Sequence, residues 1–296
     1  MIKDDLVGPN HEIHFLTFAA GKTKLRMAGK RLTREAIESC FFETVKLETE
    51  DSLKSDYVFW RQHSAFITNK MNANGWGKWL WKPHIIRKHL NRIPKNSLLL
   101  YLDAGCHLNL EDKFPRERLN QYASIAASGG SLAMQLVNGQ FDQKEINDLS
   151  EETWCPQDIL KYLKVPEYLQ KTPQIQAGIL LFRNDSDSKN FLNDWFDSMV
   201  HDNYAFLRDY PRVQTDDLDF RGHRYDQSVF SPLYKLSNLP TIDDETWFAP
   251  NWSLNGADFP IWAKRNKSGM DFRKSYFWNL RKRVTHIILM IATQNH

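Results

Sequence analysis

The acidic residue Asp103 closes the apolar run LLLYLD and is followed by the small residues Ala104 and Gly105. Such a run is typical of a buried strand, and in an open α/β sheet ligands bind beyond the carboxyl ends of the strands. A carboxylate there can hold a divalent cation or accept hydrogen bonds from ribose hydroxyls, and small neighbours would let a diphosphate approach the backbone. The alternative is that Asp103 only caps the next turn or helix, and the local pattern does not decide between the two.

A second polar cluster, GHRYDQSVF at 222–230, brings His223, Arg224, Asp226 and Gln227 into five positions. Histidine can bind metal or phosphate, arginine can neutralise phosphate, and aspartate can act as a base or orient a hydroxyl. Asp226 also precedes an apolar helical pattern, so an N-cap is the alternative and would be favoured if this segment stood alone.

A third segment, GWGKWLWKPH at 75–84, combines two glycines, three tryptophans and two lysines. Tryptophan faces can stack on flat apolar ligands, and Lys78 or Lys82 can meet a phosphate near a helix start. For the tryptophans, a hydrophobic staple under a loop is the favoured alternative.

A fourth segment, PQIQAGILLFRN, carries Gln176 at the start of an apolar strand, next to Ala177 and Gly178. The small side chains indicate that a ligand or a crossing backbone comes close there, and a β-bulge is the alternative.

These segments need a scaffold, and the sequence pattern predicts one of alternating strands and helices. Strands are expected at 13–19, 97–103, 131–137 and 175–184. Helices are expected at 33–45 with Thr33 as its cap, at 79–93, 158–165 and 188–203, and over 226–236 with a kink or early end at Pro232. This alternation predicts an α/β fold with a mostly parallel sheet.

Composition narrows the class of protein. The chain has 296 residues with 42% hydrophobic and 25% charged residues, typical of a globular protein with a sizeable core. The net charge of +3 is uneven: residues 261–296 hold eight Lys or Arg against one acidic residue, a net +7, which leaves −4 for the remainder. Because the basic residues gather in the tail, nucleic-acid binding is not expected.

Other features of the sequence argue against several further classes of protein. Three cysteines without C-x-x-C spacing do not predict a disulfide framework or a zinc site. The N-terminal residues do not read as a secretory signal, and HIILMIA at 286–292 is shorter than the about 20 residues that a membrane span needs. We therefore expect a cytoplasmic protein.

Taken in order, the segments HFLTFA, GWGKWLWKPHII, LLLYLDAGC, IQAGILLFRN and HRYDQSVFS resemble a known pattern. Over about residues 12–250 the chain resembles GT-A-fold glycosyltransferases of bacterial capsule and lipopolysaccharide biosynthesis. It is more distantly similar to the glycogenin-like retaining transferases. The resemblance implies a single GT-A-like (Rossmann-related) domain over 1–260, with a mostly parallel central sheet flanked by helices, followed by a basic, aromatic, amphipathic C-terminal segment over 261–296.

The resemblance implies transfer of a hexose from a nucleoside-diphosphate sugar to a hydroxyl of a surface polysaccharide or glycolipid. A UDP-sugar is the first candidate for the donor, and the anomeric configuration of the sugar would be retained. Asp226, Gln227 and Asp103 would be catalytic. The donor would be held by Thr17 and Phe18 at the base and ribose, by Gln176, Ala177 and Gly178 at the sugar, and by Lys82, Asp103, Ala104, Gly105, His223 and Arg224 around the diphosphate.

One departure from the family pattern concerns the metal. Metal-dependent members carry Asp-x-Asp where this chain has Asp103-Ala104-Gly105, so the second carboxylate is missing. A divalent cation prefers several oxygen ligands. Mn²⁺ or Mg²⁺ could be held by Asp103, with His223 or Asp226 completing the set. Otherwise Lys82 and Arg224 would carry the phosphate charge without a metal.

The C-terminal segment RKSYFWNLRKRVTHIILMIA at 273–292 mixes basic, aromatic and apolar residues. It could lie on an anionic membrane surface, which would make the protein peripheral on the inner face of the cytoplasmic membrane, or it could pack as a helix on the body.

Two other functions stay open. One is a sugar-nucleotide nucleotidyltransferase, for which the basic loop AAGKTKLR at 19–26 would match only partly. The other is a non-catalytic carbohydrate-binding protein, which would more often be an all-β sandwich.

Overall fold

The computed structural model describes residues 7–137, 148–210, 220–246 and 252–270. Within them, a six-stranded sheet has the order β2-β1-β3-β6-β5-β7. Its strands are β1 (Ile13–Ala19), β2 (Thr44–Thr49), β3 (Leu98–Asp103), β5 (Ser131–Gln135), β6 (Ile175–Arg183) and β7 (Thr241–Asp243). Only β6 pairs antiparallel with its neighbours, so the sheet is mostly parallel, as predicted.

The central strands form because their side chains are apolar on both faces, as parallel strands covered by helices require. Every residue of β1 is buried, and β3 is buried up to Asp103. In the register of the β1–β3 pair, Phe18 lies beside Asp103. The carboxyl ends of β1 and β3 therefore meet at one edge of the sheet, where the start of β6 also lies.

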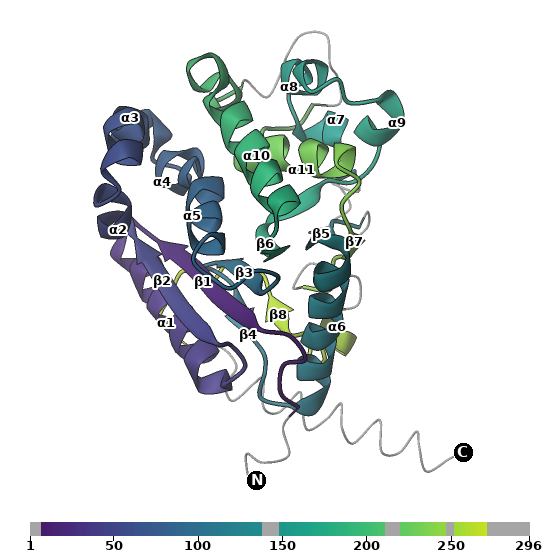
Figure 1. The fold of residues 1–296 in the computed structure, drawn as a ribbon. Helices are drawn as coiled ribbons and strands as arrows, with labels where there is room; N and C mark the ends of the chain where they lie inside the picture. Colours follow the sequence, from purple (N-terminus) through teal and green to yellow (C-terminus); the bar gives the residue numbers. More distant parts are fainter. Residues whose placement is uncertain (1–6, 138–147, 211–219, 247–251, 271–296) are drawn as a thin grey trace.

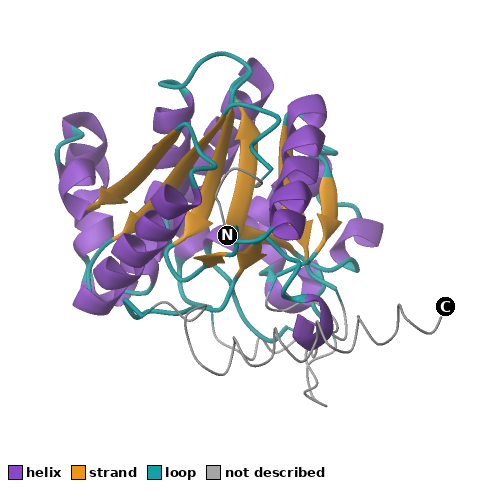
Figure 2. Ribbon diagram, turned by 90° about the horizontal axis from the view of Figure 1, so that it is seen from below, coloured by secondary structure: helices purple, strands orange, loops and turns teal. Residues whose placement is uncertain are grey.

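Helices cover both faces of the sheet (Figures 1 and 2). On one face lie α1 (Thr23–Ser39) and α6 (Lys113–Gly129), packed on even-numbered side chains of β3 such as Leu98 and Leu100. On the other face lie α3 (Tyr57–Thr68), α5 (Trp81–Leu90), α8 (Gln157–Tyr162), α10 (Ser186–Tyr204) and α11 (Asp226–Leu236). Tyr101 of β3 faces this second layer, and strand alternation puts Asp103 on the same side.

Shorter elements connect these layers. They are α2 (Glu50–Lys54), η2 (Lys70–Asn72), α4 (Gly75–Lys78), α7 (Glu151–Trp154), α9 (Glu167–Gln170), η3 (Ala205–Leu207) and α12 (Trp252–Asn255). A separate two-stranded ladder joins β4 (His107–Leu108) to β8 (Ile261–Trp262). This ladder fastens the first residues of the predicted C-terminal segment to the loop that follows β3. Residues 271–296, which include the stretch expected to lie on a membrane or to pack on the body, lie outside the described residues.

The helix predicted at 33–45 is wrong at both ends. The helix begins at Thr23 and ends at Ser39, and 44–49 form β2. Thr33 is not a cap but lies mid-helix, with its hydroxyl donating to the Gly29 carbonyl at 2.8 Å. Gly29 hid the early start because glycine usually weakens a helix. Here a Cβ at position 29 would lie 2.6 Å from the Ala19 Cβ, so glycine lets α1 pack closely on β1.

The helix at Asp226–Leu236 passes through Pro232 without ending there. Proline lacks the N–H that would bond to the carbonyl four residues earlier, which belongs to Ser228. That carbonyl instead accepts a hydrogen bond from the Cys155 thiol at 3.1 Å. The other predicted strands and helices lie within a few residues of their observed bounds.

Candidate active site

Several of the predicted site residues come together where β3 ends, β6 begins and helices α5 and α11 start. Asp103 is the last residue of β3, Asp226 is the first of α11, and Lys82 is the second of α5. The ammonium of Lys82 lies 2.6 Å from the Asp226 Oδ2 atom and 3.2 Å from the Asp103 Oδ1 atom. The structure thus joins three segments that are far apart in the sequence.

Asp103 has defined partners and also faces solvent. Its Oδ1 atom accepts a hydrogen bond from the Tyr101 hydroxyl at 2.7 Å, while 38% of its side chain is exposed. A Cβ at Gly178 would lie 2.9 Å from the Asp103 Oδ2 atom. The approach of this carboxylate explains the small residue at 178. The β5–β6 register also shifts here, because Ala133 pairs with Leu180 and Gln135 with Ile175, so the extra residues of the irregularity lie on β6 around Gly178, as the β-bulge alternative expected.

Asp226 does not act as the N-cap of α11, because Tyr225 holds that position and no side-chain cap is formed. Its carboxylate points instead at Lys82, and only 6% of the side chain is exposed. The Trp195 indole donates to the Asp226 carbonyl at 3.3 Å and so fixes the helix start. Burial raises the pKa of Asp226 to about 6, Lys82 opposes that rise, and the like charge of Asp103 adds to it.

Lys82 is enclosed in the core between α5 and the sheet. Its three ammonium protons have three acceptors: Asp226, Asp103 and the Ala177 carbonyl at 3.0 Å. Burial alone would lower the pKa of Lys82, but the two carboxylates outweigh it and raise the pKa. The side chain is therefore a fixed positive charge, held by a complete set of partners.

The segment that leads into α5 is strained. Five successive residues, Gly75 to Trp79, have positive φ angles of 61, 50, 89, 54 and 58°. Three of them are not glycine, and each such residue costs on the order of 1 kcal/mol. The turn persists because Trp76 stacks on Trp60 and the Trp81 indole donates to the Gly75 carbonyl. Strain of this kind gathers at functional sites. Here the turn places Lys78 against the Tyr225 ring and leads into α5, where Lys82 contacts Asp226.

A second strained residue, Tyr225, precedes Asp226, with φ 50° and ψ −112°. Its ring lies 4.1 Å from the Lys78 ammonium, a cation–π contact. Asp209 accepts hydrogen bonds from Lys78 at 2.5 Å and from the Tyr225 hydroxyl at 2.7 Å. These contacts hold the backbone turn that aims Asp226.

Arg224 and Gln227 form a polar group beside Asp226. The Arg224 guanidinium stacks 4.0 Å above the Trp154 ring and donates to the Gln174 side chain at 3.3 Å. Gln227 donates to the same Gln174 oxygen at 2.9 Å. Burial and then the charge of Arg265 lower the pKa of Arg224 to about 10. An anion placed at Arg224 would offset both effects.

Gln176 and Ala177 line the start of β6. The Gln176 side chain is buried, and its Nε2 atom has no hydrogen-bond partner among the described residues. Buried polar atoms usually have partners, so an unpaired donor here is consistent with a position that a ligand completes. Ala177 contributes its carbonyl to Lys82.

The remaining donor-binding residues of the prediction are packed within the protein. Thr17 is fully buried and its hydroxyl donates to the Leu102 carbonyl at 2.8 Å, which ties β1 to β3. Phe18 stacks on Trp81, with ring centroids 3.8 Å apart. Ala104 is buried, and a Cβ at Gly105 would lie 3.0 Å from the Arg265 backbone. The last contact explains the glycine at 105 by close packing of the chain.

One of the two ring nitrogens of His223 is engaged within the protein. Its Nε2 atom donates to the Phe206 carbonyl at 3.0 Å, while its buried Nδ1 atom has no hydrogen-bond partner among the described residues. Burial lowers the pKa of His223 to about 3, so the ring is neutral at physiological pH. Within the part of the chain that the structure describes, no group of three or more His, Cys, Asp or Glu side chains is arranged to hold a metal ion.

A buried ionic network supports the loop after β3. Arg31 and Glu35, one helical turn apart on α1, pair at 2.8 Å, and both side chains are fully enclosed. Arg31 donates to the Ala104 carbonyl at 3.1 Å, while Glu35 accepts from the Leu108 amide at 3.0 Å and contacts His107 at 2.8 Å. The network therefore fixes the turn that follows Asp103.

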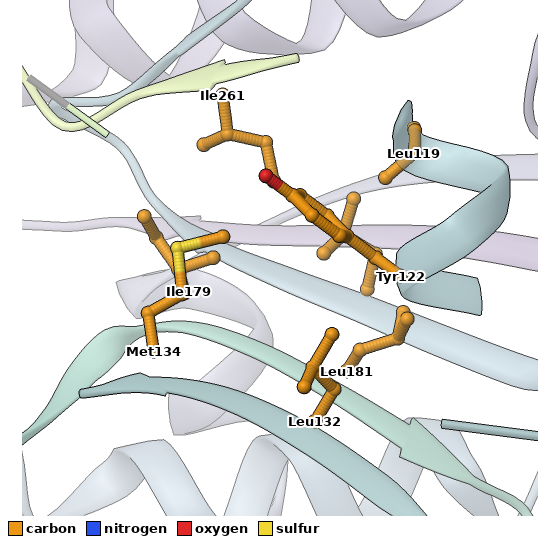
Figure 3. Close-up of a pocket in the computed structure, with 8 residues that line it drawn as sticks. Leu119, Tyr122, Leu132, Met134, Ile179, Leu181 and Ile261 are labelled. Carbon is orange, nitrogen blue, oxygen red and sulfur yellow. The ribbon is translucent and has the colours of Figure 1, made fainter. Parts of the chain in front are cut away.

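A cavity in the core is not part of this site (Figure 3). It measures about 10 Å³ and lies between α6 and the sheet, on the face away from Lys82. Figure 3 shows the side chains of Leu119, Tyr122, Leu132, Met134, Ile179, Leu181 and Ile261 around it. A space of that size barely admits one water and the lining is apolar, so it is a packing gap rather than a ligand site.

The comparisons with known proteins give structural neighbours only. No family model matches the chain, and no curated protein matches it. One similar solved structure is a glycosyltransferase involved in glycosylation of the major capsid of PBCV-1, at 11% identity and a TM-score of 0.45, covering 93% of this chain and 99% of that one. Another is mouse xyloside xylosyltransferase 1, at 10% identity and a TM-score of 0.42, covering 87% and 97%. Likeness at these values carries no argument about activity.

Sequence reasoning missed several residues that shape the site. Tyr101 lies two residues before Asp103 and reads as part of the apolar run, although its hydroxyl holds that carboxylate. Gln174 lies in the fourth segment, PQIQAGILLFRN, but of its two glutamines only Gln176 was predicted to be a site residue, and Asp209 lies in a segment without a recognisable motif. The Arg31–Glu35 spacing of four residues on a helical stretch was the one available signal for the supporting network.

Proposed function

We propose that the chain is a glycosyltransferase that moves a hexose from a nucleoside-diphosphate sugar to a carbohydrate hydroxyl. The observation that carries the proposal is the cluster of Lys82, Asp103, Asp226 and Arg224 at the edge where the parallel strands end. Ligands of open α/β sheets bind beyond that edge. The cluster offers the Arg224 guanidinium for a diphosphate and the Asp103 carboxylate for hydroxyl groups, which are the two needs of a sugar nucleotide.

Loss of the diphosphate from the anomeric carbon is the difficult step, and stabilising its charge is the main task of the site. Arg224 would meet the diphosphate, since an anion there offsets its burial and its repulsion from Arg265. The partly exposed Asp103 would accept hydroxyl protons of the donor. Asp226 and Gln227 would lie beside the anomeric carbon, with Gln176 donating to the sugar.

Finer parts of the proposal rest on the family resemblance of the sequence motifs. They are a GT-A-like domain over 1–260, a UDP-sugar donor, retention of configuration, and a surface-polysaccharide or glycolipid acceptor of the bacterial capsule or lipopolysaccharide type. Thr17 and Phe18 would shape the base site from beneath, since both are buried. A peripheral membrane contact would be made by the basic segment within 261–296. Among the described residues, no helix is both long and apolar enough to span a bilayer.

The rival functions fit the described residues less well. A nucleotidyltransferase needs a basic loop free for phosphates after the first strand. Here the Gly21 amide donates to Glu50 at 2.8 Å, and Arg26 pairs with the same carboxylate. An all-β carbohydrate-binding sandwich does not match the layered α/β architecture.

The proposal is tested by product analysis with a panel of nucleotide sugars and simple glycoside acceptors. The expected result is release of a nucleoside diphosphate from one donor, together with a glycosylated product. Release of pyrophosphate from a sugar phosphate and a nucleoside triphosphate would instead establish the nucleotidyltransferase. Absence of both reactions across the panel would count against an enzyme of either type.

A further inference from the structure

The two carboxylates of the candidate site are joined by one ammonium group. We propose that the chain binds its donor diphosphate without a divalent metal, because Lys82 takes the place between Asp103 and Asp226 that such an ion would need. The inference rests on the proposed glycosyltransferase function and adds to it how the donor charge is neutralised.

The contacts of the Lys82 ammonium are complete. An ammonium has three N–H donors, and this one has Asp226 at 2.6 Å, the Ala177 carbonyl at 3.0 Å and Asp103 at 3.2 Å. Only 2% of the Lys82 side chain is exposed. A metal that entered between the carboxylates would have to expel a buried charge that is already satisfied.

The site also offers few ligands for a metal ion. A Mg²⁺ ion needs near-octahedral oxygen ligands at about 2.0–2.1 Å. At this site Tyr101 and Lys82 both contact the Oδ1 atom of Asp103, and Asp226 is enclosed against Lys82. In the described ranges, no group of three or more His, Cys, Asp or Glu side chains is arranged to hold a metal ion. Among the described residues, the oxygen ligands at this site therefore do not suit the divalent metal that an Asp-x-Asp site would hold.

The chain also supplies positive charge of its own through Arg224. The Arg224 guanidinium is positioned by Trp154 and Gln174, next to the start of α11. Arg265 is close enough to lower the pKa of Arg224, so two cations face one region. A guanidinium can bind phosphate oxygens through two parallel N–H bonds, which gives both charge and orientation. Lys82 holds the carboxylates, and Arg224 is left for the diphosphate.

The experiment is calorimetric titration of the whole chain with UDP, GDP, ADP and dTDP, once in EDTA and once in Mn²⁺. The expected result is that one diphosphate binds and that its Kd differs by less than about tenfold between the two buffers. Binding that weakens more than about tenfold in EDTA would overturn the inference and leave the proposed function standing. If no diphosphate binds in either buffer, the proposed function fails, and the inference fails with it.

A variant pair adds a second readout. In Lys82→Ala the two carboxylates face each other without their cation, so we expect diphosphate binding in EDTA to fall at least tenfold, about 1.4 kcal/mol, and to recover partly in Mn²⁺. Lys88→Ala is the matched control, since Lys88 lies on the same helix and pairs with Asp56 away from the site. Binding by Lys82→Ala in EDTA at the wild-type Kd would contradict the role given to Lys82. If that variant does not fold, the wild-type comparison still decides.

Discussion

The ammonium of Lys82 lies 2.6 Å from the Asp226 carboxylate, although 144 residues separate the two in the chain. A buried pair of this kind contributes little net stability over apolar side chains of the same volume. Its retention in the core is therefore better explained by what it does at the end of the sheet. It fixes a carboxylate beside Asp103, at the edge where ligands of α/β sheets bind.

The two carboxylates should be essential to turnover and unequal in their effect on folding. Asp103→Asn and Asp226→Asn should each lower kcat/KM by about 100-fold or more, the scale of losing a charged transition-state contact. Asp226→Ala should also destabilise the fold by about 3 kcal/mol, because it removes a partner of a buried ammonium.

Kinetics with the transferred sugar and thermal melts measure these effects. Asp187→Asn serves as the control, since Asp187 is an exposed residue of α10. Turnover near the wild-type rate in both Asn variants would remove Asp103 and Asp226 from the mechanism.

The pH dependence of activity should follow the ionisation of Asp226. Burial raises its pKa to about 6, and the charge of Asp103 contributes to that rise. Below this pH the carboxyl is protonated and neutral, so kcat/KM should fall about tenfold per pH unit on the acid side. Asp103→Asn removes a like charge, so the acid limb of its residual activity should move to lower pH. A limb that stays in place or moves upward in this variant would contradict the assignment.

Acid should unfold the protein partly through Glu48, which joins β2 to His89 of α5 at 2.6 Å. Burial would raise the pKa of Glu48, but the hydrogen bond and charge of His89 outweigh it and lower the pKa to about 2. The stabilisation is thus present above the ordinary value of 4.5 and is lost as the pH falls from 4.5 toward 2.

Glu48→Gln should reduce the free energy of unfolding at neutral pH by up to about 3 kcal/mol and flatten its slope between those pH values. Urea denaturation at a series of pH values measures both effects. Glu38→Gln, at an exposed residue of α1, is the control and should leave the curve unchanged. An identical acid slope in Glu48→Gln would show that this pair does not govern acid unfolding.

The Arg31–Glu35–His107 network should be required to hold the loop after Asp103. Arg31→Ala leaves a buried carboxylate without its main cation, which costs about 3–5 kcal/mol. Arg34→Ala, an exposed neighbour on the same helix, should change stability by less than about 0.5 kcal/mol. Equal melting temperatures for the two variants would show that the network is not structural.

Much of the fold was predictable because β1, β3 and β6 are long apolar runs bounded by turn residues, a pattern that strands of a covered sheet must have. Helix α10 was predictable for a similar reason, since Phe191, Trp195 and Met199 mark one buried stripe. The start of α1 was not predictable, because Gly29 looks like a helix breaker until its contact with Ala19 is known.

The candidate site itself stays a prediction, and the pairing of its residues was not predictable. Asp103, Lys82 and Asp226 stand out by type and position, yet nothing local indicates that one lysine joins both carboxylates. Lys82 at a helix start was expected to meet a phosphate, and the structure pairs it with Asp103 and Asp226 instead. The antiparallel insertion of β6 decides this arrangement, because it places Gly178 beside Asp103, and strand direction is not encoded in strand composition.

The central claim is that the edge formed by Asp103, Lys82, Asp226 and Arg224 binds a nucleoside diphosphate. Thermal shift of the purified chain against UDP, GDP, ADP and dTDP tests it most directly, with Arg224→Gln as the paired variant. A ligand of the native state at about 100 times its Kd stabilises the fold by about 2.7 kcal/mol. We predict that one of the four raises the melting temperature of the wild type and raises that of Arg224→Gln much less. No shift with any of them, or an equal shift in the variant, would contradict this account of the site.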